Sequence, residues 1–262
     1  MLDIVSPNTD YNVAKFKKAA EKCIKDIISH RKMPIICGGT GFWISAMVDN
    51  KNFPAVLPDW NLRKKLAKFS AVKLYEKLKK FDPERAKNID KNNKVRLIRA
   101  IEICHSIGKV PKQNYDLGFK NLPASRQGYK FLQIGVNLPK EKLYRNIRIR
   151  LDKRFKQGMI KEVKDLHEKY GVSWKRLELF GLEYRWIAKY LHPVKYHEVV
   201  SISSEFNRVK NKLSLQDMKL RLYQEIKNYA KRQMTWFKKD SRIQWVKNKK
   251  EASKLVANFL RK

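Results

Sequence analysis

The sequence predicts an α/β fold that is rich in helix and carries an all-α insertion. Apolar residues recur at helical spacing over long stretches, and the 262 residues include only 10 glycines and 9 prolines, fewer than turn-rich β proteins use. One short apolar run, 33–37, is followed directly by a glycine-rich turn and a helical pattern, which is the order of an α/β unit. Residues 60–107 contain helical patterns but few strand signals, which favours a separate helical domain.

The N-terminal part predicts a helix, a strand and a second helix. The first helix is expected to run to His30, with Asn8, Thr9 and Asp10 as candidates to cap its free backbone N–H groups. Its apolar residues fall on one stripe: Val13, Phe16, Ala20, Cys23, Ile24, Ile27 and Ile28. The run Met33–Cys37 predicts a buried strand because it is too short for a helix. The turn Gly38–Gly41 and a helix from Phe42 to Val48 follow.

The remaining elements are mostly helices. Two apolar stripes occur within 60–107, namely Leu74, Leu78 and Phe81, then Val95, Ile98, Ile101 and Cys104. A second strand is expected at 129–136, followed by a helix with the ladder Leu143, Ile147, Leu151 and Phe155 and a break at Gly158. Further helices are expected near 160–170, 174–191, 215–237 and 252–260, with an irregular connection at 192–212. We therefore expect a helical insertion domain at 59–121 and an α/β core formed by 1–58 and 122–262.

The charge of the chain points to a polyanionic partner. The sequence has 60 Lys and Arg residues and 25 Asp and Glu residues, a formal net charge of +35. Because such self-repulsion destabilises a compact state, we expect a nucleic acid, an acidic membrane surface or a phosphorylated ligand to be bound. Hydrophobic residues make up 43% and aromatic residues 11% of the chain, which is enough for a core and argues against disorder.

Several protein classes lack support in the sequence. Cys23, Cys37 and Cys104 are widely spaced and odd in number, so a reducing compartment is expected rather than a disulfide scaffold. No apolar run approaches the roughly 18 residues that a membrane span needs, and no signal-peptide pattern is visible. The five histidines have no metal-ligand spacing, and neither a nucleophile elbow nor an HExxH motif occurs. We therefore expect a cytoplasmic protein without membrane contact and without a protein-built metal site.

Two groups of residues suit phosphate binding. The turn Gly38–Gly41 lets the backbone approach an anion, and Thr40 adds a hydroxyl group where a helix begins, although a plain strand-to-helix turn is an equally good explanation. A second group shares one predicted helix and comprises Arg145, Arg148, Arg150 and Arg154. Such arginines can grip phosphate, or they can form an ordinary solvated basic face.

Two further groups suit RNA. Arg96 and Arg99 lie one turn apart on a predicted helix, with Arg63 upstream, and they suit RNA backbone contact or simply a soluble surface. In 229–240, cations alternate with Tyr229, Trp236 and Phe237, and stacking groups beside cations bind unpaired bases. The alternative is that these aromatic side chains belong to the core and only the cations face solvent.

In this order, the motifs resemble the tRNA dimethylallyltransferases, also called tRNA isopentenyl transferases. The matching stretches are Leu2–Pro7 with Tyr11, Val13 and Phe16; Gly38–Phe42; Asp82 and Pro83 with Ala86; Arg96–Glu102; Leu143–Asp152 with Gly158, Glu162 and Val163; and Tyr229–Phe237. They cover nearly the whole chain. Arg96–Glu102 and Tyr229–Phe237 are specific, whereas the glycine turn alone would not be.

The resemblance implies a fold and a reaction. The fold is a P-loop-type parallel sheet core, which also implies nucleotide (ATP) binding, with an inserted helical domain. The reaction is transfer of a dimethylallyl group from dimethylallyl diphosphate to N6 of the adenosine 3′ of the anticodon, in tRNAs that read codons starting with U. The base is flipped into a channel and the diphosphate enters from the other end. Mg²⁺ is implied with the leaving diphosphate, the tRNA anticodon stem-loop is the implied partner, and we expect a monomer.

The resemblance also assigns residues by position. Thr40 and Arg63 match tRNA-contact sites, and Val95–Arg99, with Arg96 and Arg99, matches another. Arg150 matches a cation near the diphosphate. Two C-terminal stretches match RNA contacts, Leu177–Glu183 and Lys227–Met234, and the second contains Lys227, Lys231, Arg232 and Gln233. Glu183–Arg185 departs from the commoner Tyr-Lys after the family glycine.

The family's phosphate loop, GxTxxGK(S/T), and a later Asp-Ser motif do not occur in these 262 residues. The loop holds the diphosphate, and the Asp is the proposed general base, so no catalytic residue is assigned here. The strand before the loop would be central in the sheet, and parallel strands are normally covered on both faces. Three accounts are open: the segment is encoded upstream, which we favour; the chain is an inactive tRNA-binding paralogue; or another chain supplies the loop. We predict that this chain alone lacks prenyl transfer. A generic basic RNA-binding protein would explain the charge but not the ordered motifs.

Overall fold

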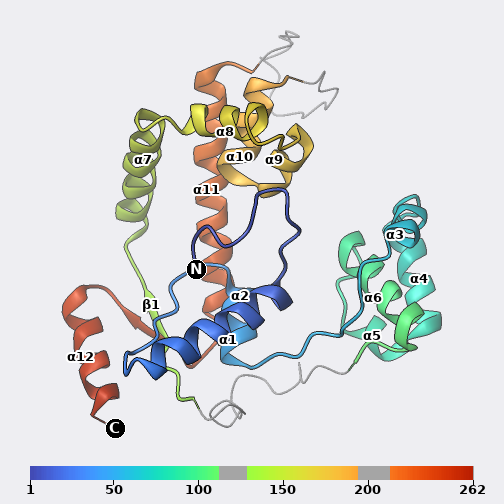
Figure 1. Cartoon of the computed structure of the whole chain (residues 1–262), viewed down its shortest axis with the longest axis horizontal. Helices are drawn as coiled ribbons and strands as arrows, with labels where there is room; N and C mark the ends of the chain where they lie inside the picture. The colour runs from blue at the N-terminus through green and yellow to red at the C-terminus, as the bar shows by residue number, and fades with distance from the viewer. Residues whose placement is uncertain (112–128, 194–212, 262) are drawn as a thin grey trace. The chain divides into compact units, whose positions relative to one another are not determined.

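The computed structural model describes residues 1–111, 129–193 and 213–261 (Figure 1). Helices dominate it, and the described residues contain one sheet of two strands. The chain divides into two compact units, Met1–Ile44 with Lys130–Lys262, and Ser45–Tyr129. The predicted insertion at 59–121 falls within the second unit, with its end at 112–121 outside the described residues. The boundaries of the two predicted domains stay a prediction.

The first unit contains the sheet and most of the helices. The helices are α1 (Val13–Ser29), α7 (Lys140–Lys156), α8 (Met159–Glu168), α9 (Trp174–Phe180), α10 (Leu182–Leu191), α11 (Leu215–Phe237) and α12 (Lys249–Leu260). Helix α2 (Gly41–Val48) starts in this unit and continues into the second one. Strands β1 (Ile134–Val136) and β2 (Gln244–Val246) pair in parallel, with Ile134 opposite Gln244 and Val136 opposite Val246.

The strand predicted at Met33–Cys37 is wrong. These residues form no ladder within the described part of the chain, and Ile35 is 84% exposed. An apolar run favours an extended backbone, but only a hydrogen-bonding neighbour makes that backbone a strand. Of the second predicted strand, 129–136, only the last three residues form a strand, β1. Its partner β2 was not predicted.

The predicted start of the first helix is also wrong. Asn12 is the N-cap, and its side chain accepts hydrogen bonds from the backbone N–H groups of Ala14 and Lys15. The residues expected to cap, Asn8 to Asp10, are held elsewhere because the Arg176 guanidinium binds the carbonyl groups of Pro7 and Thr9. Of the predicted stripe on α1, Ala20 and Ile24 are buried, whereas Cys23 and Ile28 are exposed.

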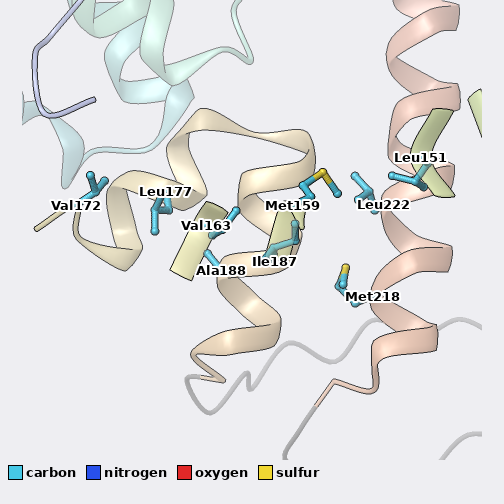
Figure 2. Packing of buried hydrophobic residues seen from close by; sticks show 9 residues of the cluster. All are labelled: Leu151, Met159, Val163, Val172, Leu177, Ile187, Ala188, Met218 and Leu222. Carbon is cyan, nitrogen blue, oxygen red and sulfur yellow. The ribbon is translucent and has the colours of Figure 1, made fainter. Parts of the chain in front are cut away.

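The core of the first unit lies between α7, α8, α9, α10 and α11 (Figure 2). Its buried residues are Leu151, Met159, Val163, Val172, Leu177, Ile187, Ala188, Met218 and Leu222. Figure 2 shows Leu151 of α7 beside Leu222 of α11, so the predicted ladder on α7 does face the core. The single helix predicted at 174–191 is two helices, because Gly181 takes a positive φ of 80° between them.

The second unit is helical, as predicted for this part of the chain. It contains α3 (Trp60–Ala67), α4 (Ala71–Phe81), α5 (Pro83–Lys87) and α6 (Lys94–Ile107). Its core is formed by Leu66, Leu74, Leu78, Ala86, Leu97, Ala100, Ile101 and Cys104. The predicted stripe on α6 needs correction, because Val95 is 78% exposed while Leu97 and Ala100 are buried. Val95 lies in the first turn of α6 but points away from the core, and the buried residues begin at Leu97, two residues further on.

Candidate nucleic-acid interface

The turn that carries Thr40 is docked on the C-terminal half of α11. The Gln233 side-chain amide donates a hydrogen bond of 3.0 Å to the Gly39 carbonyl oxygen. The Thr40 Oγ1 and Tyr229 hydroxyl groups lie 3.5 Å apart. A Cβ at Gly41 would lie 2.1 Å from Cδ1 of Trp236, so the backbone contacts the indole directly. Thr40 therefore forms one cluster with Tyr229 and Gln233 of α11, although the turn and these two residues are 189 to 194 positions apart in the sequence.

Helix α2 places the Thr40 hydroxyl group at a positive helix end. The Thr40 carbonyl accepts the hydrogen bonds of the Trp43 and Ile44 backbone N–H groups, so Thr40 directly precedes the first turn. That turn contains no acidic residue, and the dipole of a helix attracts anions at its N-terminus. The centroid of the Trp43 ring lies 4.6 Å from that of Phe16 on α1 and 5.9 Å from that of Tyr11, which precedes α1. The turn thus contacts α11, and the helix that follows it contacts α1.

Cations and aromatic rings alternate along α11. The Lys227 ammonium group lies 4.7 Å from the centroid of the Tyr144 ring and 5.1 Å from that of Tyr223. The Arg232 guanidinium lies 5.8 Å from the Tyr229 ring, and the Lys231 and Arg232 side chains are exposed. Rings beside cations suit stacked bases and phosphate groups.

In the second unit the structure joins Arg63 and Arg99 through Glu102. Arg63 donates from Nε to Oε1 and from Nη2 to Oε2, both at 2.8 Å. Arg99 donates from Nη1 to Oε2, and the Asp59 backbone N–H donates to Oε1 at 2.7 Å. Arg99 is therefore not simply a cation of the soluble surface, because its guanidinium also binds this carboxylate. Arg96 is exposed on the same helix.

Glu102 was missed by the sequence analysis. Its side chain is only 1% exposed, which is unusual for an acid unless cations accompany it. Burial by itself would raise the pKa of this carboxyl group. The hydrogen bonds from Arg63, Arg99 and the Asp59 backbone outweigh that effect, so the pKa of Glu102 lies below its ordinary value. An acid inside the apolar run Ala100–Cys104 was the available signal.

The other predicted site residues of the first unit are not part of the Thr40 cluster. Arg150 is exposed on α7, and no interaction between described residues joins it to Thr40. Arg154, another arginine of the predicted group on this helix, forms an ion pair with Glu183. In the predicted stretch Leu177–Glu183, Leu177 is a core residue and Glu183 is this ion-pair partner. This stretch supports the fold of the first unit.

The described residues contain no cluster of metal-ligating side chains. Among residues 1–111, 129–193 and 213–261, no three His, Cys, Asp or Glu side chains cluster in a way that could hold a metal ion. Mg²⁺ is usually held by one or two carboxylates together with substrate phosphates, so the Mg²⁺ implied by the resemblance does not depend on such a cluster. None of the helices in the described part of the chain is long and apolar enough to cross a membrane.

The family model and the relatives that match this chain belong to the family that its motifs resemble. A family model described as IPP transferase matches residues 1–240. The tRNA dimethylallyltransferase of Acetivibrio thermocellus is 35% identical over 255 residues, which is 96% of this chain and 74% of that protein. The protein of the same name from Pelotomaculum thermopropionicum is 35% identical over 250 residues, covering 94% of this chain and 72% of that protein.

Solved structures agree with these relatives. The tRNA delta(2)-isopentenylpyrophosphate transferase from Staphylococcus epidermidis matches with a TM-score of 0.57 and 28% identity, over 99% of this chain and 80% of that chain. A eukaryotic dimethylallyltransferase acting on tRNA shares the fold, with a TM-score of 0.65 and 20% identity, over 93% of this chain and 59% of that chain. The resemblance drawn from the motifs is confirmed, and this chain belongs to the IPP transferase family.

Proposed function

We propose that this chain serves prenyl transfer to tRNA, as its relatives named tRNA dimethylallyltransferase do. The donor is dimethylallyl diphosphate, and the acceptor is N6 of the adenosine 3′ of the anticodon in tRNAs that read codons starting with U. The observation that carries the proposal is the docking of the Thr40 turn on α11, where Gln233 binds Gly39 and Thr40 meets Tyr229. The P-loop type of the core is part of this proposal.

The reaction exchanges one bond for another. The bond between C1 of the dimethylallyl group and the diphosphate oxygen breaks, a bond from C1 to N6 of adenosine forms, and N6 loses a proton. The Thr40 hydroxyl group at the start of α2 can hydrogen-bond the polar edge of a flipped base or an oxygen of the diphosphate. Cations stabilise the charge that develops on the leaving diphosphate, and Arg150 is proposed for this role by position. No general base is assigned to a residue of this chain.

The RNA itself is proposed to lie against cations of both units. Arg63, Arg96 and Arg99 contact the backbone from the helices of the second unit, and Lys227, Lys231 and Arg232 contact it from α11. Phosphate contacts of this kind position the RNA, whereas the site around Thr40 reads the base. A cytoplasmic location follows from tRNA as the partner, and the monomeric state and the use of Mg²⁺ stay predictions.

A second candidate function is tRNA binding without transfer. It is favoured by one observation, namely that no GxTxxGK(S/T) motif occurs within the 262 residues. Since that loop holds the diphosphate in the family, we expect this chain by itself to bind tRNA without incorporating the prenyl group. Both candidates use the same RNA-binding residues.

One experiment separates the two candidates. The purified chain is incubated with undermodified tRNA and labelled dimethylallyl diphosphate, and both RNA binding and incorporation of label are measured. Binding without incorporation is the expected result for the chain alone. Efficient incorporation, lost in a Thr40→Ala variant and absent with fully modified tRNA, would show a complete enzyme that needs no such loop. A chain that neither binds tRNA nor transfers the label would contradict both candidates.

A further inference from the structure

We infer that Glu102 is a positioning residue for RNA binding, because its buried carboxylate holds the Arg63 and Arg99 guanidinium groups side by side for contact with the RNA backbone. The inference rests on the proposed function, since it takes these two arginines to be RNA contacts. It adds a residue that makes no contact with RNA itself and acts through the two arginines.

The geometry around Glu102 leaves little freedom. Two N–H groups of Arg63, one of Arg99 and the Asp59 backbone N–H all donate to the two carboxylate oxygens. The arginines come from α3 and α6, so one carboxylate fixes side chains of two helices. A second bond, from Arg99 Nη2 to the Val56 carbonyl oxygen at 2.9 Å, holds the Arg99 guanidinium from its other end. Charge-assisted bonds of this kind are the strong ones in proteins.

The same geometry leaves donors available for a ligand. A guanidinium group carries five N–H donors on Nε, Nη1 and Nη2. Arg63 binds Glu102 through Nε and Nη2, which leaves Nη1, and Arg99 uses Nη1 and Nη2, which leaves Nε. The two side chains are 30% and 34% exposed, whereas that of Glu102 is 1% exposed. The side chains of Arg63, Arg99 and Glu102 together carry a charge of +1, and the two cations are the exposed members of this set.

Stability alone does not account for this arrangement. Replacing a buried ion pair by apolar residues of similar size is often neutral or stabilising, so such pairs are weak contributors to folding.

The effect of Glu102 on RNA binding can be told apart from that of its charge alone. Long-range electrostatics predicts tighter RNA binding when Glu102 is removed, whereas the positioning role predicts weaker binding. Removal of one acid from a chain with a net charge of +35 would strengthen attraction to RNA, whereas loss of positioning would weaken binding. The sign of the change therefore distinguishes the two explanations.

The test is Glu102→Gln in the full chain, which keeps the shape of the side chain and removes its charge. Filter binding of undermodified tRNA is measured at several salt concentrations. We expect affinity to fall by several-fold to about tenfold, and the slope of log K against log salt to become shallower by about 1 to 2, as two phosphate contacts weaken. In an Arg63→Ala/Arg99→Ala background, Glu102→Gln should have no further effect, because its partners are gone.

Control variants separate this role from general effects. Glu84→Gln removes an acid of the same unit that pairs with Lys87 at the surface, and its tRNA affinity should equal or slightly exceed that of the wild type. Arg63→Lys/Arg99→Lys keeps both charges but loses the planar fork, and it should bind as weakly as Glu102→Gln, which tests the inference even if Glu102→Gln folds poorly. Thermal unfolding of each variant reports its folding.

The outcomes are distinct. The inference is overturned if Glu102→Gln binds tRNA as tightly as the wild type. It is also overturned if Glu102→Gln lowers tRNA affinity by the same factor in the Arg63→Ala/Arg99→Ala background as in the wild type. Both outcomes leave the proposed function intact. Unchanged binding by Arg63→Lys/Arg99→Lys overturns it as well. If Arg63→Ala/Arg99→Ala itself binds like the wild type, the proposed RNA contact by these arginines is wrong and the inference falls with it.

Discussion

At the scale of single residues, the absence of a side chain at Gly41 allows the Thr40 turn to dock on α11. A Cβ at this position would lie 2.1 Å from Trp236 Cδ1 and 2.7 Å from Cγ, near the root of the side chain, so the whole indole would have to move. We predict that Gly41→Ala destabilises the fold by about 1 to 3 kcal/mol through overpacking and weakens tRNA binding. Urea unfolding and filter binding measure the two effects.

Gly38 provides the matched control. It lies in the same turn, but a Cβ there would meet nothing within 4 Å. The free energy of unfolding of Gly38→Ala should therefore lie within about 0.5 kcal/mol of that of the wild type, and the variant should bind tRNA equally well. Equal behaviour of the two variants would show that contact between Gly41 and Trp236 does not hold the turn.

Single residues also show which contacts a sequence pattern can predict and which it cannot. Thr40 and Gln233 could be named because family motifs contain them, although nothing in their local sequence indicates that they meet. Glu102 could not be connected to Arg63, because the two lie 39 residues apart and the pairing depends on how α3 packs against α6. A long-range ion pair leaves no periodic pattern in the sequence. The only indication is an acidic residue within an apolar run, because a buried acid needs a cation nearby.

At the scale of elements, helices were predicted well and strands were not. The predicted helix at 215–237 coincides with α11, because helical spacing is a local pattern that runs over many residues. Strand β2 covers three residues, Gln244–Val246, which is too short for any period to be visible. The apolar run Met33–Cys37 shows the reverse error, since a strand depends on a partner as well as on its own residues.

The contact between α8 and α10 gives a prediction for alkaline pH. The Tyr184 hydroxyl group donates a 2.6 Å hydrogen bond to Glu162, and burial, together with this acceptor, raises the pKa of Tyr184 to about 12. A pKa raised above the ordinary 10.0 favours the folded state below pH 10, and that contribution is lost as pH rises toward 12. Tyr184→Phe should cost about 1 kcal/mol below pH 10, and the difference from the wild type should vanish toward pH 12.

Unfolding by urea at a series of pH values measures this difference. Tyr170→Phe is the control, because Tyr170 is exposed near the end of α8 and its removal should change stability little at any pH. A stability difference between wild type and Tyr184→Phe that stays constant across this range would contradict the assignment.

At the scale of the whole molecule, the net charge of +35 acts on folding and on binding in opposite directions. Self-repulsion among the cations destabilises the folded chain, and salt screens that repulsion. When Lys and Arg side chains bind RNA phosphate groups, they release the counterions that were bound to the RNA. Added salt opposes this release, so it weakens RNA binding. The cations proposed to bind RNA lie on α3 and α6 and along α11, and we expect the remaining excess of Lys and Arg to speed the encounter with RNA.

We therefore predict that NaCl stabilises the chain and weakens its binding to tRNA over the same concentration range. The thermal midpoint should rise between low salt and about 1 M NaCl, where the screening length falls to roughly 3 Å. Log K for tRNA should fall linearly with log salt, with a slope as steep as about −5 if all six proposed cations contact phosphates. Sucrose is the control, because it stabilises folded proteins by exclusion and screens no charge, so it should raise the midpoint without weakening tRNA binding. A midpoint that falls steadily with NaCl, or an affinity independent of salt, would show that the excess charge has another role.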